Sequence, residues 1–273
     1  CFVDPNNKLS IYDSLVNNGF ISFGKNESLN IKIIVSDLYQ NQSILAFDVI
    51  KQNKKQEIIQ SDSSTSFVFV HGANQVFKNK YIELKSNKKS FYDLVYFQYK
   101  NKIDSTLSSF SSIHQIHNHN TPIHNTLALT INLAKYPDSI ASKLCLAKVN
   151  SNNKLSYSGG KYIEGKLKAK IYSFGDYTVS IDTIKPIIKG LNIYPGKTMK
   201  SSTLKMTIKD EFSGINTYEG RINGQWVIME YDPKNNRLTH YFEKNLPKGK
   251  HKFDLKVTDK RENASNYEAI FYY

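Results

Sequence analysis

Four histidines stand close together in the stretch I-H-Q-I-H-N-H-N-T-P-I-H: His114, His117, His119 and His124. His117 and His119 have the H-x-H spacing. Alternate side chains of a β-strand share a face, so on a strand these two imidazoles could hold one ion. A catalytic ion would also need a carboxylate base or an activated water, and no carboxylate lies near in sequence. We therefore predict that these histidines make ordinary hydrogen bonds and that the segment has no metal site. If a metal site did exist, His117 and His119 would be the candidate ligands.

Motifs of other catalytic classes are absent from the sequence. It contains no G-x-S-x-G, and no pattern pairs a particular serine with a histidine and an aspartate. It also lacks a glycine-rich phosphate loop. We predict that this segment is not an enzyme, that it has no catalytic residue and that it needs no cofactor.

Two carboxylates open polar turns that are related by an internal repeat. V-T-D-K-R-E-N-A-S (257–265) lies between alternating apolar runs, and V-S-D-L-Y-Q-N-Q-S (35–43) does the same near the start. Asp37 and Asn41 match Asp259 and Asn263 at one offset (259 − 37 = 222; 263 − 41 = 222). Aspartate at such a position accepts hydrogen bonds from backbone N–H groups two residues on. Calcium would need several more oxygen ligands, so we predict structural hairpin turns.

The chain as a whole indicates an all-β protein. It has 273 residues with 40% hydrophobic and 12% aromatic content, and the aromatic side chains are mostly Tyr and Phe. Alternating runs predict strands, among them 94–99, 127–133 and 161–171, and Asn223-Gly224 predicts a tight hairpin. Only 138–142 favours a helical turn.

We therefore predict tandem β-sandwich modules. Residues 1–52 form the C-terminal part of an immunoglobulin-like sandwich that is incomplete at its N-terminus, because four or five of about seven strands can be placed. Residues 53–181 form a central β-sandwich. Residues 182–273 form a complete immunoglobulin-like sandwich of about seven strands.

The net charge of +13 raises the question of an anionic partner. The lysines are scattered among asparagines, and no arginine stripe or nucleic-acid-binding signature is present, so we predict no nucleic-acid partner. Solvated loops explain such lysines, and contact with an anionic surface is the alternative. No apolar run reaches the ~18–20 residues of a membrane span.

The first residue is Cys1, which indicates either a removed leader or a fragment of a longer chain. Cys1 is a candidate for lipid attachment or for a disulfide with Cys145, and an ordinary strand residue explains it equally well.

Several blocks together resemble the C-terminal region of Bacteroidota cell-envelope proteins whose N-terminal part is an M23-type (lysostaphin/LytM-like) zinc peptidase. They are D-T-I-K-P-I-I-K-G-L-N-I (182–193), D-E-F-S-G-I (210–215), I-N-G-Q-W-V-I-M-E-Y-D (222–232) and V-T-D-K-R-E-N-A-S. The middle of the chain is similar through I-H-N-H-N-T-P-I-H (116–124), Ser158-Gly159-Gly160 and S-F-G-D-Y (173–177).

The peptidases of that family hold zinc with an H-x-x-x-D pair and an H-x-H pair. No histidine in this chain has aspartate four residues on, and His117 falls in the accessory stretch. The resemblance therefore implies a non-catalytic accessory region that docks or positions a peptidase-like domain on an outer-membrane or envelope partner complex. It implies a periplasmic, outer-membrane-associated or extracellular location.

Two alternatives stay open. The segment could belong to an active M23-type peptidoglycan endopeptidase whose zinc domain lies upstream, or it could be a carbohydrate-binding module, recognisable by an exposed Tyr/Trp row. The resemblance also makes Ser14, Ser139 and Thr183 candidates for O-glycosylation, because each follows aspartate and precedes an aliphatic residue.

Overall fold

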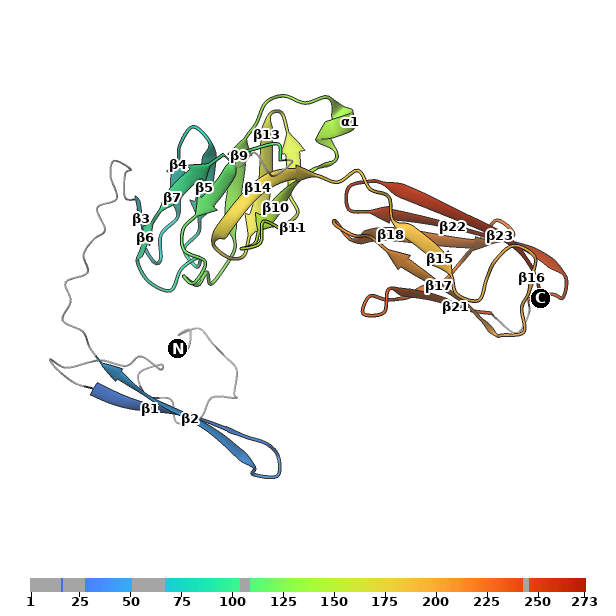
Figure 1. Ribbon diagram of the computed structural model, residues 1–273, viewed down its shortest axis with the longest axis horizontal. Helices are drawn as coiled ribbons and strands as arrows, with labels where there is room; N and C mark the ends of the chain where they lie inside the picture. Colours follow the sequence, from blue (N-terminus) through green and yellow to red (C-terminus); the bar gives the residue numbers. More distant parts are fainter. Residues whose placement is uncertain (1–15, 17–27, 51–66, 104–108, 243–245) are drawn as a thin grey trace. The chain divides into compact units, whose positions relative to one another are not determined.

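The computed structural model describes residues 16, 28–50, 67–103, 109–242 and 246–273, and these divide between two compact units, Cys1–Ser64 and Thr65–Tyr273. Nearly all regular structure is β, and α1 (Asp138–Ala141) is the one helix in the described ranges (Figure 1). The predicted all-β class is confirmed, as is the helical turn near residue 138. No helix among the described residues has the length and apolarity to cross a bilayer.

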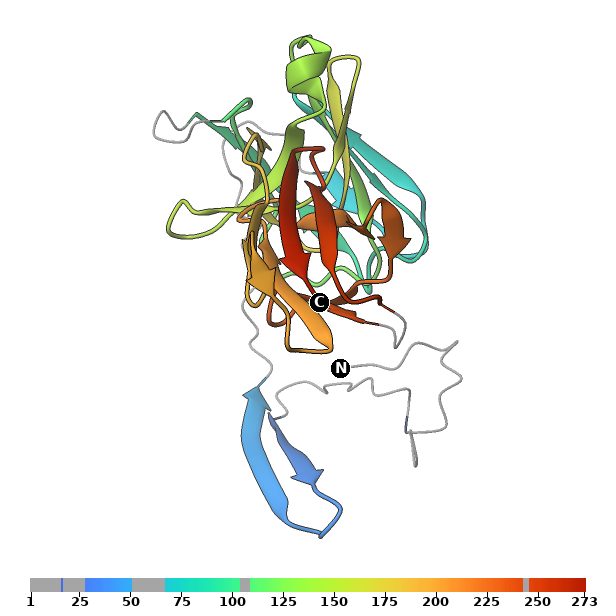
Figure 2. The ribbon, with the colours of Figure 1, turned by 90° about the vertical axis from the view of Figure 1, so that its right-hand side faces the viewer.

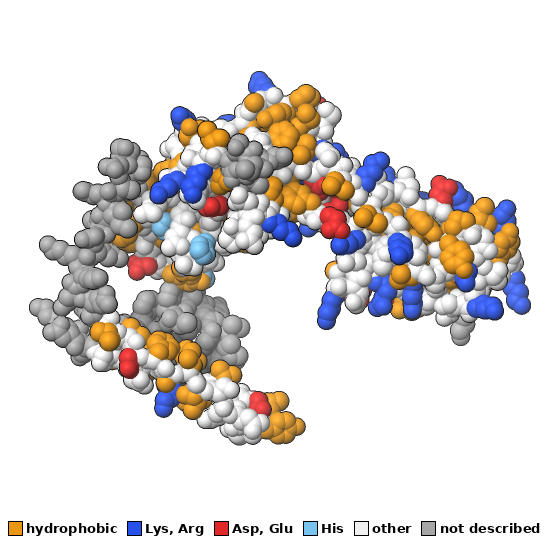
Figure 3. Space-filling view, in the orientation of Figure 1, with side chains coloured by type: hydrophobic (Ala, Val, Ile, Leu, Met, Phe, Trp, Pro, Cys, Tyr) orange, Lys and Arg blue, Asp and Glu red, His pale blue; other side chains and the backbone are white. Residues whose placement is uncertain are grey.

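The first unit contains an antiparallel hairpin of β1 (Ser28–Ser36) and β2 (Gln42–Ile50). Its register repeats that of the last hairpin of the chain, β22 (Lys250–Asp259) with β23 (Ala264–Tyr272). Val35 pairs with Ser43, as Val257 pairs with Ser265. The inward side chains of β22 are buried, whereas apolar side chains of the first hairpin are exposed along its length (Figure 3). Of the module predicted at 1–52, residues 1–15, 17–27 and 51–52 lie outside the described residues.

The central part of the second unit is a sandwich of two five-stranded antiparallel sheets (Figures 1 and 2). The first sheet has the order β11 (Leu155–Tyr157), β10 (Leu144–Val149), β14 (Gly175–Ile181), β8 (Ile113–Ile116) and β7 (Tyr99–Lys102). The second has the order β12 (Lys161–Ile163), β13 (Lys166–Ile171), β9 (Leu127–Asn132), β5 (Ile82–Ser86) and β4 (Gln75–Lys78). Period-two alternation supplies one continuous core of Phe, Ile, Leu, Val and Tyr side chains between them.

Two strand predictions in this module were wrong in extent. The run 94–99 is divided at Gln98, because β6 (Val95–Phe97) pairs with β3 (Phe67–Phe69) whereas β7 pairs with β8. The run 161–171 is divided by a turn in which Glu164 and Gly165 both have positive φ, so it forms two adjacent strands of one sheet. Alternation alone does not reveal a tight turn that preserves the polar and apolar order.

The C-terminal part of the second unit is a second sandwich with its own core. One sheet has the order β15 (Ile187–Gly190), β17 (Thr203–Lys209), β21 (Arg237–Tyr241) and β20 (Glu230–Asp232). The other has the order β16 (Lys197–Thr198), β23, β22, β18 (Ile215–Ile222) and β19 (Gln225–Val227), with β16 parallel to β23. The sequence predicted about seven strands here. The additional ones are edge strands of two or three residues, too short to leave a periodic signal.

Candidate binding surface

Six lysines gather on the outward face of the sheet β12-β13-β9-β5-β4, which we call the lysine face. Lys166, Lys168 and Lys170 alternate along β13, with buried Leu167 and half-buried Ala169 between them pointing to the core. Three more outward lysines come from β12, β5 and β4, namely Lys161, Lys85 and Lys78. All six are exposed. Because strands lie about 4.8 Å apart and alternate residues about 6.7 Å apart, the six ammonium groups form a two-dimensional array on one face of the sheet.

Strand register brings these lysines together from distant parts of the sequence. Lys168 lies between Lys161 on β12 and Thr130 on β9, and Thr130 lies opposite Glu83 on β5. Lys170 and Lys85 both pair with Ala128, so one small residue separates them. The sheet therefore concentrates charge that is dispersed along the chain.

Acidic compensation on this face is confined to one side. Glu83 bridges Lys85 at 2.9 Å and Lys78 at 3.4 Å. The Lys85 ammonium beside it holds the pKa of this carboxyl below its usual value. The four lysines of β12 and β13 have no ion pair with any described residue, and Glu164 occupies the turn between these strands. The β12–β13 side thus keeps its positive charge.

The outward face of β22 provides a contrast within the same unit. It also carries three outward lysines, at positions 250, 252 and 256, with Asp254 between the last two. There Lys252 bridges Asp254 at 2.7 Å and Glu268 at 3.2 Å, and Lys256 pairs with Glu219 across the sheet. This face is charged but mixed in sign, whereas the lysine face has one dominant sign.

No aromatic row runs across either face of the C-terminal sandwich within the described strands. Trp226 is 63% exposed on β19, but its neighbours across the sheet are Arg221, Asp254 and Glu268. On the other sheet exposed Tyr241 lies opposite Thr203. The feature expected of a carbohydrate platform does not form in these described strands.

The four clustered histidines do not share a site. β8 ends at Ile116, and His117 has φ of 55°, so the expectation that His117 and His119 lie on one strand face is wrong. His117 uses both ring nitrogens on protein partners, the Gln98 backbone N–H at 3.3 Å and the Thr121 hydroxyl at 3.0 Å. His119 is exposed. His124 lies 2.8 Å from the hydroxyl of Tyr92.

His114 is the deeply buried member of the group, at 1% exposure on β8. Its Nδ1 lies 2.8 Å from the Tyr99 hydroxyl, and burial lowers the pKa of the imidazole to about 4. A neutral histidine held in the core is a structural residue, and its charged form would destabilise the fold.

A polar hollow of about 600 Å³ lies beside this loop, over β7, β8, β10 and β14. Two of its charged residues are engaged with neighbours: Asp176 accepts from Gln115 at 2.9 Å, and Lys148 donates to Ser173 at 2.6 Å. No described residue in it forms a nucleophile–base pair. The hollow therefore adds polar surface next to the sheet opposite the lysine face.

The repeated turns are built alike around their aspartates. Asp37 Oδ1 accepts from the backbone N–H of Asn41 at 2.9 Å, and Asp37 Oδ2 accepts from its Nδ2 at 2.8 Å. Asp259 and Asn263 make the same two bonds at 2.9 and 2.7 Å. The Asn41 amide lowers the pKa of Asp37. Asn223 and Gly224 form the tight β18–β19 turn with φ of 50° and 80°.

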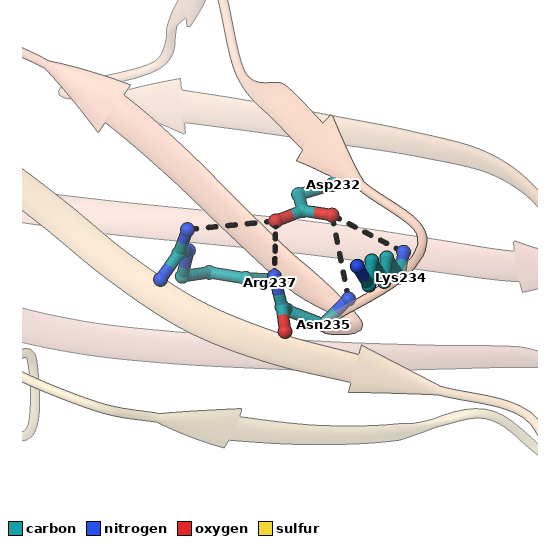
Figure 4. Close-up of polar contacts among 4 residues, drawn as sticks. All are labelled: Asp232, Lys234, Asn235 and Arg237. Atoms are coloured by element: carbon teal, nitrogen blue, oxygen red, sulfur yellow. Dashed lines mark hydrogen bonds and ion pairs between the residues drawn. The ribbon is translucent and has the colours of Figure 1, made fainter. Parts of the chain in front are cut away.

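A third aspartate turn joins β20 to β21 (Figure 4). The Asp232 carboxylate accepts from the Asn235 side chain at 2.7 Å and from the Lys234 backbone N–H at 3.1 Å, and it lies 3.5 Å from Arg237. The Asn235 amide holds the pKa of this carboxyl below its usual value. Hydrogen bonds and a neighbouring cation thus account fully for this turn.

The two sandwiches of the second unit are joined by the turn that follows β22. Arg261 donates to the Leu144 carbonyl at 2.9 Å and to the Tyr157 hydroxyl at 2.9 Å, and its guanidinium lies over the Tyr157 ring at 5.5 Å. Lys143 donates to the Arg261 carbonyl at 2.6 Å. These charge-assisted bonds couple the two modules.

The remaining candidates are placed as follows. Cys145 is a free thiol with no exposure, and burial raises its pKa to about 12. Ser139 and Thr183 are exposed, so both hydroxyl groups are accessible to modification. Cys1 and Ser14 lie outside the described residues.

The geometry of the described residues defines the class: this is a protein of tandem β-sandwich modules, one of which has a basic sheet face. Residues 66–182 match the family model of a Zu5-like domain, which is the central sandwich and less than half of the chain. The matched range begins inside the predicted central module, 53–181, and ends at the first residue of the predicted C-terminal module. No curated protein matches this chain.

Proposed function

We propose that this chain is a non-catalytic docking region of a cell-envelope protein, and that the lysine face is the surface by which it lies on an anionic envelope surface. The single observation that carries the proposal is the array of four uncompensated lysines on β12 and β13. Lysines near an anionic lipid surface contribute about 1 kcal/mol each, so four of them supply useful affinity without a pocket.

The composition of the face favours lipid phosphates over nucleic acid. The exposed apolar side chains of its described strands are aliphatic: Val76, Ala128 and Ile163. The outward positions of its described strands carry no aromatic ring for base stacking and no arginine for bidentate contact with bases. An array of lysine ammonium groups is suited to the phosphate groups of a membrane surface.

The coupled sandwiches suit a positioning role. Bonds from Arg261 and Lys143 fix the C-terminal module to the central one, so contact at one module orients the other. The resemblance to accessory regions of M23-type peptidases supports the view that a peptidase-like domain is what is positioned. An active upstream zinc domain remains the alternative account of the whole protein, and H-x-x-x-D and H-x-H motifs in the complete gene would favour it.

Vesicle co-sedimentation of the purified 273-residue chain tests the proposal. We expect binding to vesicles that contain anionic phospholipid, no binding to zwitterionic vesicles, and weakening as salt is raised, because exposed charges are screened. Single-stranded and duplex nucleic acid should compete poorly.

Two results would overturn the proposal. One is equal binding to anionic and zwitterionic vesicles. The other is tighter binding to nucleic acid than to anionic vesicles at the same salt concentration. Peptidoglycan cleavage by the purified chain would refute its non-catalytic character.

A further inference from the structure

Three carboxylates come together where the central sandwich meets the C-terminal one. Asp182 directly follows β14, Asp210 follows β17, and Asp259 is the last residue of β22. One side-chain oxygen from each lies within 4.8 Å of the others. Two oxygens that each lie about 2.4 Å from one ion are at most about 4.8 Å apart, so these oxygens could share a single ion.

Burial makes this arrangement costly without a cation. Asp182 is 2% exposed and Asp259 is fully buried. Like charges at such separations repel strongly away from water. No described basic side chain forms an ion pair with any of the three. The nearby Arg261 is bonded to the Leu144 carbonyl and Tyr157, and Lys260 lies over the Tyr157 ring at 5.7 Å.

Backbone hydrogen bonds hold the carboxylates in place without neutralising them. Asp182 Oδ2 accepts from the Ser213 N–H at 3.1 Å, and Asp210 Oδ2 accepts from the Gly214 N–H at 2.7 Å. Asp259 Oδ1 accepts from the Asn263 N–H at 2.9 Å.

Two buried oxygens at the cluster have no hydrogen-bond partner among the described residues: Oδ1 of Asp210 and Oγ of Ser213. Ser213 is 2% exposed and lies against Asp182 through its backbone N–H. Buried polar atoms in native proteins are nearly always paired, so both oxygens call for a ligand. The turn's own hydrogen bonds account for neither of them.

We propose that Asp182, Asp210 and Asp259 bind one Ca²⁺ ion. The donors are hard oxygens from three separate turns, which suits the adaptable coordination of Ca²⁺ better than the strict octahedron of Mg²⁺. The inference stands independently of the lysine face and of the proposed function.

The bound ion would stabilise the junction between the sandwiches. The Asp182 backbone N–H donates to Lys143 of the central module at 3.1 Å, and its carbonyl accepts from Asn263 of the last turn at 3.0 Å. An ion held by Asp182, Asp210 and Asp259 ties this linker to two turns of the C-terminal sandwich. Calcium thus strengthens the same junction that Arg261 bridges.

Thermal unfolding and equilibrium dialysis of the purified chain test the site, with CaCl₂ against EGTA. We expect one bound Ca²⁺ per chain and a rise in the unfolding midpoint of roughly 5–10 °C at millimolar Ca²⁺. Asp210→Asn should abolish both effects. It is chosen because Asp210 is the least buried of the three carboxylates and the amide keeps the oxygen that accepts the turn hydrogen bonds.

Asp232→Asn is the matched control, because Asp232 also caps a turn (Figure 4) but is not one of the three clustered carboxylates. It should bind and respond to Ca²⁺ as the unmodified chain does. Dialysis of the unmodified chain keeps the test valid if Asp210→Asn folds poorly. No bound Ca²⁺, an Asp210→Asn variant that still responds, or an equal response to MgCl₂ would overturn the assignment.

Discussion

Removing the three lysines of β13 is the most informative perturbation of the lysine face. The variant Lys166→Gln, Lys168→Gln, Lys170→Gln leaves the inward residues Leu167 and Ala169 unchanged. The substituted side chains are exposed and make no ion pair with a described residue, so the free energy of unfolding should change by less than about 1 kcal/mol.

The expected loss of vesicle binding follows from the geometry. The three ammonium groups lie on one strand within about 13 Å and face the same way. At about 1 kcal/mol per lysine, their removal costs about 3 kcal/mol, which is roughly a hundredfold weaker partition onto anionic vesicles. The slope of affinity against salt should also become shallower, because fewer charges are neutralised on binding.

A matched control separates the face from the total charge. The variant Lys250→Gln, Lys252→Gln, Lys256→Gln also removes three outward lysines from one strand. These lysines lie among acidic side chains, including Asp254 and Glu268, so we expect at most a fewfold loss. Vesicle co-sedimentation of both variants at two salt concentrations is the assay. Equal losses in the two variants, or unchanged binding after the β13 substitutions, would refute the reasoning.

Three further predictions concern stability. Because the pKa of His114 is lowered to about 4, the unfolded chain takes up a proton near pH 6.5 that the folded chain resists. The free energy of unfolding should therefore keep its full value above pH 6.5 and fall by up to ~3 kcal/mol towards pH 4. Urea midpoints should show this dependence on pH, and the same dependence in the His114→Gln variant would contradict the prediction. Arg261→Met removes two hydrogen bonds of 2.9 Å between the sandwiches but keeps an apolar stem, so calorimetry should show the modules unfolding more separately; a single unchanged transition would argue against coupling. Gly190→Ala places a methyl group in steric overlap with the Ile193 carbonyl oxygen and should cost about 2–4 kcal/mol of unfolding free energy. Gly196→Ala, where space is open, should cost about 1 kcal/mol, and equal urea midpoints for the two variants would show that the chain relaxes freely.

Local patterns were sufficient to predict the all-β class and the repeated hairpins. Alternation with period two depends only on neighbouring residues, as does the aspartate turn in which Asp259 binds the Asn263 backbone. The divided run at Gln98 was missed, because the change of sheet there depends on which distant strand each half pairs with.

The candidate sites could not be predicted, because register between distant strands creates them. Lys78 and Lys170 are far apart in sequence and are brought to one face by the pairing of β4, β5, β9 and β13. The H-x-H spacing of His117 and His119 misled in the opposite way, because β8 ends one residue before it. Spacing indicates a shared face only while the strand continues.

Photo-crosslinking in the cells that produce the protein tests the central claim most directly. A photo-reactive residue would replace Lys168 at the centre of the lysine face in one version of the full-length protein, and Lys252 on β22 in another. The account predicts phospholipid-mass adducts at position 168 and few or none at 252. Adducts of equal yield at both positions, or no lipid adduct at 168, would contradict docking through the lysine face.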